Sequence, residues 1–152
     1  MPNQLNKPVF RKLFKEDREV WQELWAGYLE FYQHELSPEQ TALTWQRFFD
    51  QKYNLWAFGI EVDGVIVGFA HCSFTNSTWN QTPDLYLEDL FVAPSARRQG
   101  LGELLISGCA AFAQERGAGR IHWLTHRDNE TAQRVYRKLA TMSEFVIFEK
   151  KL

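Results

Sequence analysis

The sequence predicts a mixed α/β fold, in which a mostly antiparallel sheet carries helices on both faces. Two stretches rich in β-branched and aromatic residues are joined by Asp63-Gly64, a residue pair that favours a tight hairpin turn. Residues 84–92 are apolar on both faces, as expected at the centre of a sheet. Helical and strand patterns then alternate, which is typical of a β-α-β-α run.

The N-terminal half is expected to contain two helices and three strands. A short strand at residues 9–14 precedes a helix whose aromatic stripe consists of Trp21, Leu24, Trp25, Tyr28 and Tyr32. Ser37-Pro38-Glu39-Gln40 has the hydroxyl, the first-turn proline and the glutamine of a capping box, so a second helix should run to about Phe49. The hairpin strands are expected at residues 55–60 and 65–75.

The C-terminal half is expected to alternate between strands and helices. Pro94 ends the central strand at residues 84–92. A helix then runs from Leu101 to Gly117, a suitable C-cap residue. The remaining elements are a strand at residues 120–125, a helix at 129–140 and a last strand at 145–148.

The charge balance argues against nucleic acid and membranes as partners. Seventeen Lys and Arg stand against 19 Asp and Glu, a net charge of −2, so no basic excess attracts phosphate backbones or anionic lipid. The first residues lack the pattern of a signal peptide, and no stretch is long enough to span a membrane. We therefore expect a cytoplasmic protein with a single domain over residues 1–152.

The metal-ligating residue types do not form a cluster in the sequence. Cys72 and Cys109 lie far apart in apolar segments, and we interpret both as buried thiols. His71, His122 and His126 have no accompanying ligands, which indicates structural or pocket-lining histidines. No metal is expected.

The segment Arg97-Arg98-Gln99-Gly100-Leu101-Gly102 lies between a central strand and a helix. Unpaired N–H groups and the helix dipole favour a bound anion there, and glycines let a phosphate approach the backbone. Taken alone, the segment fits equally well a glycine-tolerant turn with a solvated arginine pair.

The same six residues match the Arg/Gln-x-x-Gly-x-Gly/Ala signature of the GNAT acyltransferase superfamily, which this chain resembles. Leu87 to Val92 is similar to the central strand of that superfamily, and Asn129 to Tyr136 is similar to its Asn-x-x-Ala-x-x-x-Tyr helix. The resemblance covers the C-terminal half closely and the N-terminal half by pattern only. It implies the acyl-CoA N-acyltransferase fold, in which two parallel strands of the sheet splay apart.

The resemblance also implies acetyl-CoA as co-substrate. The six-residue loop would hold the pyrophosphate, while the pantetheine arm would run beside the central strand. The residues that inherit cofactor binding are Leu90, Phe91, Val92, Arg97, Arg98, Gln99, Gly100, Leu101, Gly102 and Asn129.

Glu88 and Asp89 place two carboxylates in an otherwise apolar strand, and strand alternation predicts that they face opposite sides. Either could be a satisfied structural carboxylate, and we interpret Asp89 in that way. Glu88 is the candidate general base, since acetyl transfer needs an unprotonated amine and a carboxylate can take that proton directly or through one water. Tyr86-Leu87-Glu88-Asp89 also resembles diamine acetyltransferases, in which the equivalent glutamate is the base.

Tyr136 and Trp79 complete the candidate site. Tyr136 lies two helical turns after Asn129, and its spacing alone favours packing. The resemblance instead implies that its phenol protonates the departing CoA thiolate. Trp79 lies in a polar loop with little core of its own, so it is a candidate wall of the acceptor pocket.

The implied function is transfer of acetyl from acetyl-CoA to a primary amine of a small molecule, either an amino acid or a polyamine-like compound. Trp123-Leu124-Thr125-His126 followed by Asn129 resembles histone/polyamine-type and D-amino-acid N-acetyltransferases. A protein-lysine acetyltransferase and a non-catalytic acyl-CoA-binding module remain alternatives. The aromatic content of 15%, together with the dimeric state that is common in the family this chain resembles, leads us to expect a homodimer.

Overall fold

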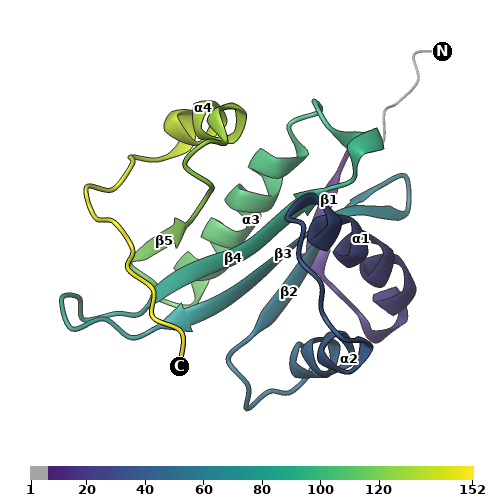
Figure 1. The fold of residues 1–152 in the computed structure, drawn as a ribbon, viewed down its shortest axis with the longest axis horizontal. Coiled ribbons are helices and arrows are strands. Elements are labelled where there is room, and N and C mark those ends of the chain that lie inside the picture. The colour runs from purple at the N-terminus through teal and green to yellow at the C-terminus, as the bar shows by residue number, and fades with distance from the viewer. Residues whose placement is uncertain (1–6) are drawn as a thin grey trace.

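A five-stranded sheet forms the centre of the computed structural model, which describes residues 7–152 (Figure 1). Two 3-10 turns, Lys15–Asp17 and Pro94–Ala96, join the main elements. In chain order the main elements are β1 (Val9–Lys12), α1 (Arg18–Phe31), α2 (Pro38–Arg47), β2 (Trp56–Val62), β3 (Val65–Thr75), β4 (Asp84–Val92), α3 (Leu101–Glu115), β5 (Arg120–Trp123) and α4 (Glu130–Leu139).

The strands lie in the sheet in their chain order, from β1 at one edge to β5 at the other. Each neighbouring pair from β1 to β4 is antiparallel, whereas β4 and β5 are parallel. The structure thus confirms the mixed, mostly antiparallel sheet. The parallel pair requires a crossover, which α3 provides.

Helices cover both faces of the sheet, as the sequence predicts. On one face α3 buries Leu105, Cys109 and Phe112 against strand residues that include Leu85 and Leu87. The Sγ atoms of Cys72 and Cys109 lie 3.5 Å apart in this layer, and both are buried free thiols, as interpreted from the sequence. On the other face an aromatic layer from α1 and α2 packs on Phe69 and Phe91 of β3 and β4.

Local sequence signals explain where several elements begin and turn. Asp63 and Gly64 have φ values of 51° and 79°, the left-handed conformation at both positions that a two-residue hairpin turn needs. At the start of α2, the Ser37 Oγ accepts a hydrogen bond from the Gln40 backbone N–H at 3.1 Å. The hairpin and the N-cap are therefore confirmed.

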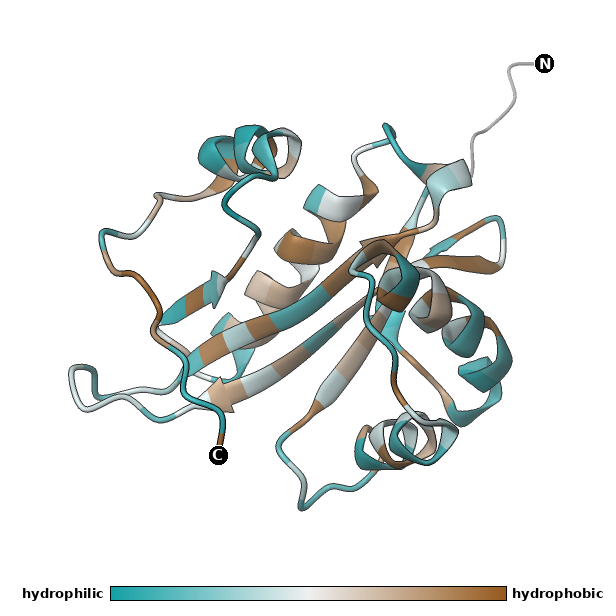
Figure 2. Cartoon of the chain, viewed as in Figure 1, coloured by the Kyte–Doolittle hydropathy of each residue, from teal (hydrophilic) through white to brown (hydrophobic). Residues whose placement is uncertain are grey.

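The strand predicted at residues 145–148 is absent from the structure. This stretch has no regular secondary structure, and Phe145 and Phe148 are 77% and 93% exposed. In Figure 2 the C-terminal segment is apolar over its middle part and polar just before its last residue. Residues 145–148 were expected to be a strand because of their composition, but a strand also needs a backbone partner.

None of the helices within residues 7–152 is both long enough and apolar enough to cross a membrane.

Candidate active site

The parallel strands β4 and β5 stay paired over only part of their length. Their pairing runs from Asp84 opposite Arg120 to Leu87 opposite Trp123. β5 ends there, whereas β4 continues to Val92. Beyond Leu87, the edge of β4 that faces β5 therefore has no strand partner within residues 7–152. The N–H and C=O groups along this edge are available to an extended ligand. The cofactor-binding candidates Leu90, Phe91 and Val92 lie in this part of β4.

Glu88 and Asp89 lie on the same side of the sheet, so the expectation of opposite faces was wrong. Asp89 pairs with His71, and Leu87 pairs with Cys72. Glu88 is thus an extra residue in β4, and such a bulge interrupts the alternation of side chains. Both carboxylates consequently line one cavity.

That cavity has a volume of about 400 Å³ and is open to the α2 side of the sheet. We call it the carboxylate cavity. Arg47 of α2 supplies its one guanidinium, which stacks over the Tyr53 ring at 4.6 Å. Among residues 7–152, Arg47 forms no salt bridge. The lining residues are Trp25, Gln40, Thr44, Arg47, Phe48, Tyr53, Asn54, Leu55, His71, Ser73, Glu88 and Asp89.

Asp89 is anchored by side chains from two other elements. Its Oδ1 accepts a hydrogen bond from the Tyr28 hydroxyl at 2.6 Å, and its Oδ2 lies 2.9 Å from the His71 Nδ1. The other ring nitrogen of His71 accepts from the indole N–H of Trp21 at 3.0 Å. The sequence interpretation of Asp89 as a paired carboxylate fits these contacts, although its partners are not an arginine or backbone amides.

The surroundings of Glu88 favour its protonated form. Partial burial raises the pKa of its carboxyl group, and the negative charge of Asp89 raises it further. A pKa above the ordinary range brings a carboxylate closer to the working pH of a general base. The bulge places this group where a ligand in the carboxylate cavity can reach it.

The loop before α3 has the conformation of an anion site. Arg98 and Gly100 both have positive φ values, 65° and 72°. The N-cap of α3 is Gly100, so no side chain caps the first N–H groups of the helix. A Cβ atom added at Gly100 or Gly102 would meet nothing within 4 Å, so the space in front of the helix is open.

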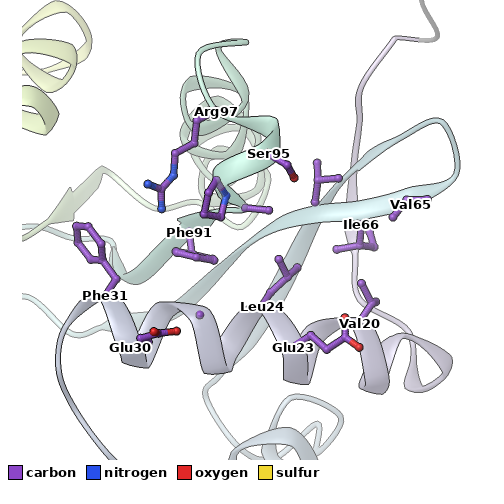
Figure 3. A pocket seen from close by; sticks show the side chains of 14 residues that line it. Val20, Glu23, Leu24, Glu30, Phe31, Val65, Ile66, Phe91, Ser95 and Arg97 are labelled. Carbon is purple, nitrogen blue, oxygen red and sulfur yellow. The ribbon is translucent and has the colours of Figure 1, made fainter.

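Arg97 turns away from this helix terminus toward α1. Its Nε donates to the Val92 carbonyl at 3.1 Å, and its guanidinium lies within 6 Å of the Phe31 and Phe91 rings. Figure 3 shows the side chain pointing into a second cavity of about 550 Å³, between α1, the start of β3 and the end of β4. Of the predicted cofactor residues, Arg97 and Phe91 line this largely apolar space. Arg98 and Gln99 stay exposed on the loop.

Tyr136 of α4 lies beside β5, across the gap between β4 and β5 from α1. Its ring packs edge-on against Trp123 of β5, with 5.4 Å between the ring centroids. Burial raises the pKa of its phenol, and Tyr32 at the end of α1 raises it further, so the group is a neutral proton donor. Asn129 is the N-cap of α4, where its Oδ1 accepts from the Ala132 N–H at 3.2 Å. Its side-chain NH₂ donates to no group within residues 7–152.

Trp79 does not line the carboxylate cavity. Its side chain is 83% exposed and lies edge-on to Phe145 of the C-terminal segment, with ring centroids 6.2 Å apart. No group of three His, Cys, Asp or Glu side chains able to hold a metal is found within residues 7–152.

Sequence reasoning missed three contributors to the site: Arg47, Tyr28 as a partner of Asp89, and the bond from Trp21 to His71. Trp21 and Tyr28 were recognised only as part of a core stripe. The histidine in an apolar strand was a signal that a buried polar partner must exist. Its partners lie 50 and 18 residues away in sequence, so no local pattern names them.

Similarity to a known family and to known proteins bears on this arrangement. The family described as "Acetyltransferase (GNAT) family" matches residues 18–140. The D-amino-acid N-acetyltransferase HPA3 of Saccharomyces cerevisiae (strain ATCC 204508 / S288c) is 32% identical over 145 residues, which cover 93% of this chain and 89% of that protein. The aminoglycoside N(6')-acetyltransferase type 1 of Salmonella enteritidis is 28% identical, covering 93% of this chain and 97% of that protein.

The fold also resembles solved structures. The aminoglycoside N-acetyltransferase AAC(6')-Iy in complex with CoA aligns with a TM-score of 0.79 and 25% identity, over 99% of this chain and 98% of that chain. A ribosomal-protein-alanine N-acetyltransferase from Brucella melitensis aligns with a TM-score of 0.80 at 18% identity, over 97% and 100% of the two chains, which shows a shared fold.

Proposed function

Since this chain belongs to the acetyltransferase (GNAT) family and is an acetyl-CoA-dependent N-acetyltransferase, we propose that its acceptor is the primary amine of a free amino acid. The observation that carries the proposal is the carboxylate cavity, in which Arg47 and Glu88 line the same 400 Å³ space. A guanidinium pairs with a carboxylate, and a carboxylate pairs with an ammonium group. An amino acid carries both partners.

The relatives support two acceptor classes, which the cavity distinguishes. The name of HPA3 gives D-amino acids as its substrate, whereas the Salmonella protein is named for aminoglycosides. An aminoglycoside or a polyamine is a polycation without a carboxylate, so it would leave Arg47 unpaired inside the site. A buried or half-buried charge without a partner weakens binding, and this favours the amino acid.

The proposed place of acetyl-CoA is the open loop and the unpaired edge of β4. The pyrophosphate would meet the uncapped N–H groups at Gly100, Leu101 and Gly102. The pantetheine arm would bond the backbone of Leu90 to Val92 and the side-chain NH₂ of Asn129. The lack of any side chain in front of Gly100 and Gly102 fits this assignment.

We assign the proton transfers to Glu88 and Tyr136. The amine loses its proton to Glu88, directly or through one water, and its nitrogen forms a bond to the thioester carbon. The carbon–sulfur bond then breaks, and Tyr136 donates a proton to the leaving thiolate. The acylated nitrogen loses its extra proton, and Tyr136 is reprotonated, so that the products are a neutral amide and the CoA thiol. The raised pKa values of both side chains support these roles, since a raised pKa makes Glu88 a stronger proton acceptor and keeps the Tyr136 phenol protonated.

We further propose a homodimer formed through the C-terminal segment, residues 142–152. Support comes from its apolar side chains, which one chain leaves in solvent: Met142, Phe145, Val146, Ile147, Phe148 and Leu152 are each at least 60% exposed. Apolar surface on this scale marks an interaction site, and a second copy of the chain offers the same apolar segment in return.

A thiol-release assay tests the acceptor class. We expect CoA release from acetyl-CoA with free amino acids, and weaker release with the amino-acid amides, spermidine, aminoglycosides and lysine peptides. Release with no free amino acid but with polyamines or peptides would overturn the acceptor assignment. Failure with every amine, despite CoA binding, would favour a non-catalytic module.

A further inference from the structure

A chain of hydrogen bonds connects the core of the protein to the carboxylate next to Glu88. It runs from Trp21 of α1 through His71 of β3 to Asp89 of β4. His71 is 1% exposed and Trp21 is fully buried, so water cannot replace these bonds. Nothing in the proposed chemistry uses Trp21 or His71 directly.

The Trp21 contact fixes which nitrogen of His71 carries the proton. An indole N–H is only a donor, so the His71 Nε2 at 3.0 Å must accept. The single proton of the neutral ring then lies on Nδ1, which donates to the Asp89 Oδ2. A proton on Nε2 would face the Trp21 N–H, donor against donor, so the bond from Trp21 is made only when Nε2 carries no proton.

The hydrogen-bonding pattern of His71 bears on the charge at Asp89. A neutral imidazole and the Tyr28 hydroxyl bind both carboxylate oxygens of Asp89 but do not cancel its negative charge. The charge therefore remains beside Glu88 in a partly desolvated cavity, where it acts over a short distance at reduced dielectric. A protonated His71 would oppose the effect of Asp89 on Glu88.

We propose that Trp21 and His71 are positioning residues which keep Asp89 as an unneutralised anion beside Glu88 and thereby set the acidic end of the enzyme's working pH range. This inference rests on the proposed role of Glu88 as general base. Trp21 does not line the carboxylate cavity, and His71, although part of its lining, is assigned no contact with either substrate, so both act through Asp89.

Other ionisable groups around Glu88 come from four elements and one loop. Tyr86 and Tyr28 are phenols whose pKa values Glu88 helps to raise, so they are neutral neighbours. Arg47 lies on the opposing element of the same cavity and pairs with the acceptor carboxylate in the proposed function. Among residues 7–152, these groups are Asp89 and Tyr86 on β4, His71 on β3, Tyr28 on α1, Arg47 on α2 and Tyr53 in the loop after α2.

The test is the pH dependence of kcat/KM for four variants. Glu88→Gln should abolish the acidic limb of this pH profile, which is the fall of kcat/KM at low pH. Asp89→Asn removes the charge, while its carbonyl can still accept from His71 and its NH₂ can donate to the Tyr28 oxygen. Trp21→Phe removes the N–H that donates to the His71 Nε2, so this nitrogen is free to take up a proton. Asp89→Asn and Trp21→Phe should each move the acidic limb to lower pH by roughly half a unit to one unit.

Trp45→Phe is the matched control. Trp45 is 4% exposed and packs on Trp21 with ring centroids 4.8 Å apart, but it makes no hydrogen bond to His71. Trp45→Phe should lower the free energy of unfolding as Trp21→Phe does, but it should leave the acidic limb of the kcat/KM profile at its original pH. An unmoved limb in Asp89→Asn, or equal shifts in Trp21→Phe and Trp45→Phe, overturns the inference. A limb that persists in Glu88→Gln contradicts the base assignment instead.

A measurement on the unaltered protein covers the case in which Trp21→Phe does not fold. Ring ¹⁵N chemical shifts distinguish the two histidine tautomers. We expect the His71 proton on Nδ1, and a proton on Nε2, or on both nitrogens at neutral pH, contradicts the inference.

Discussion

Replacing Gly102 with leucine separates cofactor binding from folding. Gly102 lies in the first turn of α3 with an ordinary helical φ, and a Cβ atom there meets nothing within 4 Å. The free protein therefore has room for the side chain. Leucine is also a better helix former than glycine, by up to ~1 kcal/mol, so the melting temperature should stay constant or rise by about 2–4 °C.

The same side chain should obstruct acetyl-CoA. It would fill the space through which the pyrophosphate reaches the uncapped N–H groups, and loss of one hydrogen bond to a charged group costs about 1.5–3 kcal/mol. We thus expect CoA to bind roughly 10- to 150-fold more weakly in calorimetry. Ser107→Leu, at an exposed position farther along α3, is the control and should bind CoA normally. Unchanged affinity in a folded Gly102→Leu protein would refute the phosphate-loop assignment.

Three further predictions concern the other parts of the site. Tyr136→Phe removes only a hydroxyl that has no hydrogen-bond partner within residues 7–152, so stability and CoA affinity should hold while turnover falls by about 10²-fold; full turnover with chemistry rate-limiting would return Tyr136 to a packing role. Arg47→Met should raise KM for a free amino acid by about tenfold or more and leave KM for its amide unchanged; equal changes would remove the carboxylate assignment. Light scattering at roughly tens of micromolar should give a dimer mass that becomes monomeric when residues 142–152 are deleted, and a monomeric mass for the undeleted chain would rule out the homodimer.

The sheet could be predicted from the sequence wherever local chemistry determines structure. The bounds of β4 at Asp84 and Val92 matched, because residues apolar on both faces are bounded by turn residues and Pro94. The positive φ values at Asp63 and Gly64 confirm a turn that two residue types specify almost by themselves.

Non-local pairing explains what could not be predicted. The bulge at Glu88 depends on how β4 meets β3, and alternation in one strand does not reveal an extra residue. The strand expected at residues 145–148 has suitable side chains, but no segment within residues 7–152 pairs with it. The bond between Trp21 and His71 joins α1 to β3 and requires the packed aromatic layer.

The candidate site was predictable where a motif places residues close together in sequence. The loop from Arg97 to Gly102 has the predicted position and an open helix terminus. The carboxylate cavity was less accessible to prediction, because α2, β3 and β4 all contribute to it. Trp79 was predicted to line the acceptor pocket because its polar loop has little core of its own; it does not line the carboxylate cavity, whereas Arg47 does.

A single competition reaction tests the central claim most directly. The protein is mixed with acetyl-CoA labelled with ¹³C in the acetyl group and with equal amounts of a free amino acid, its amide and spermidine. The labelled products are then identified and quantified by mass spectrometry. The account predicts that the label collects mainly on the nitrogen of the free amino acid, and that Glu88→Gln slows this product. Label found mainly on spermidine, on the amide or on no amine would contradict it.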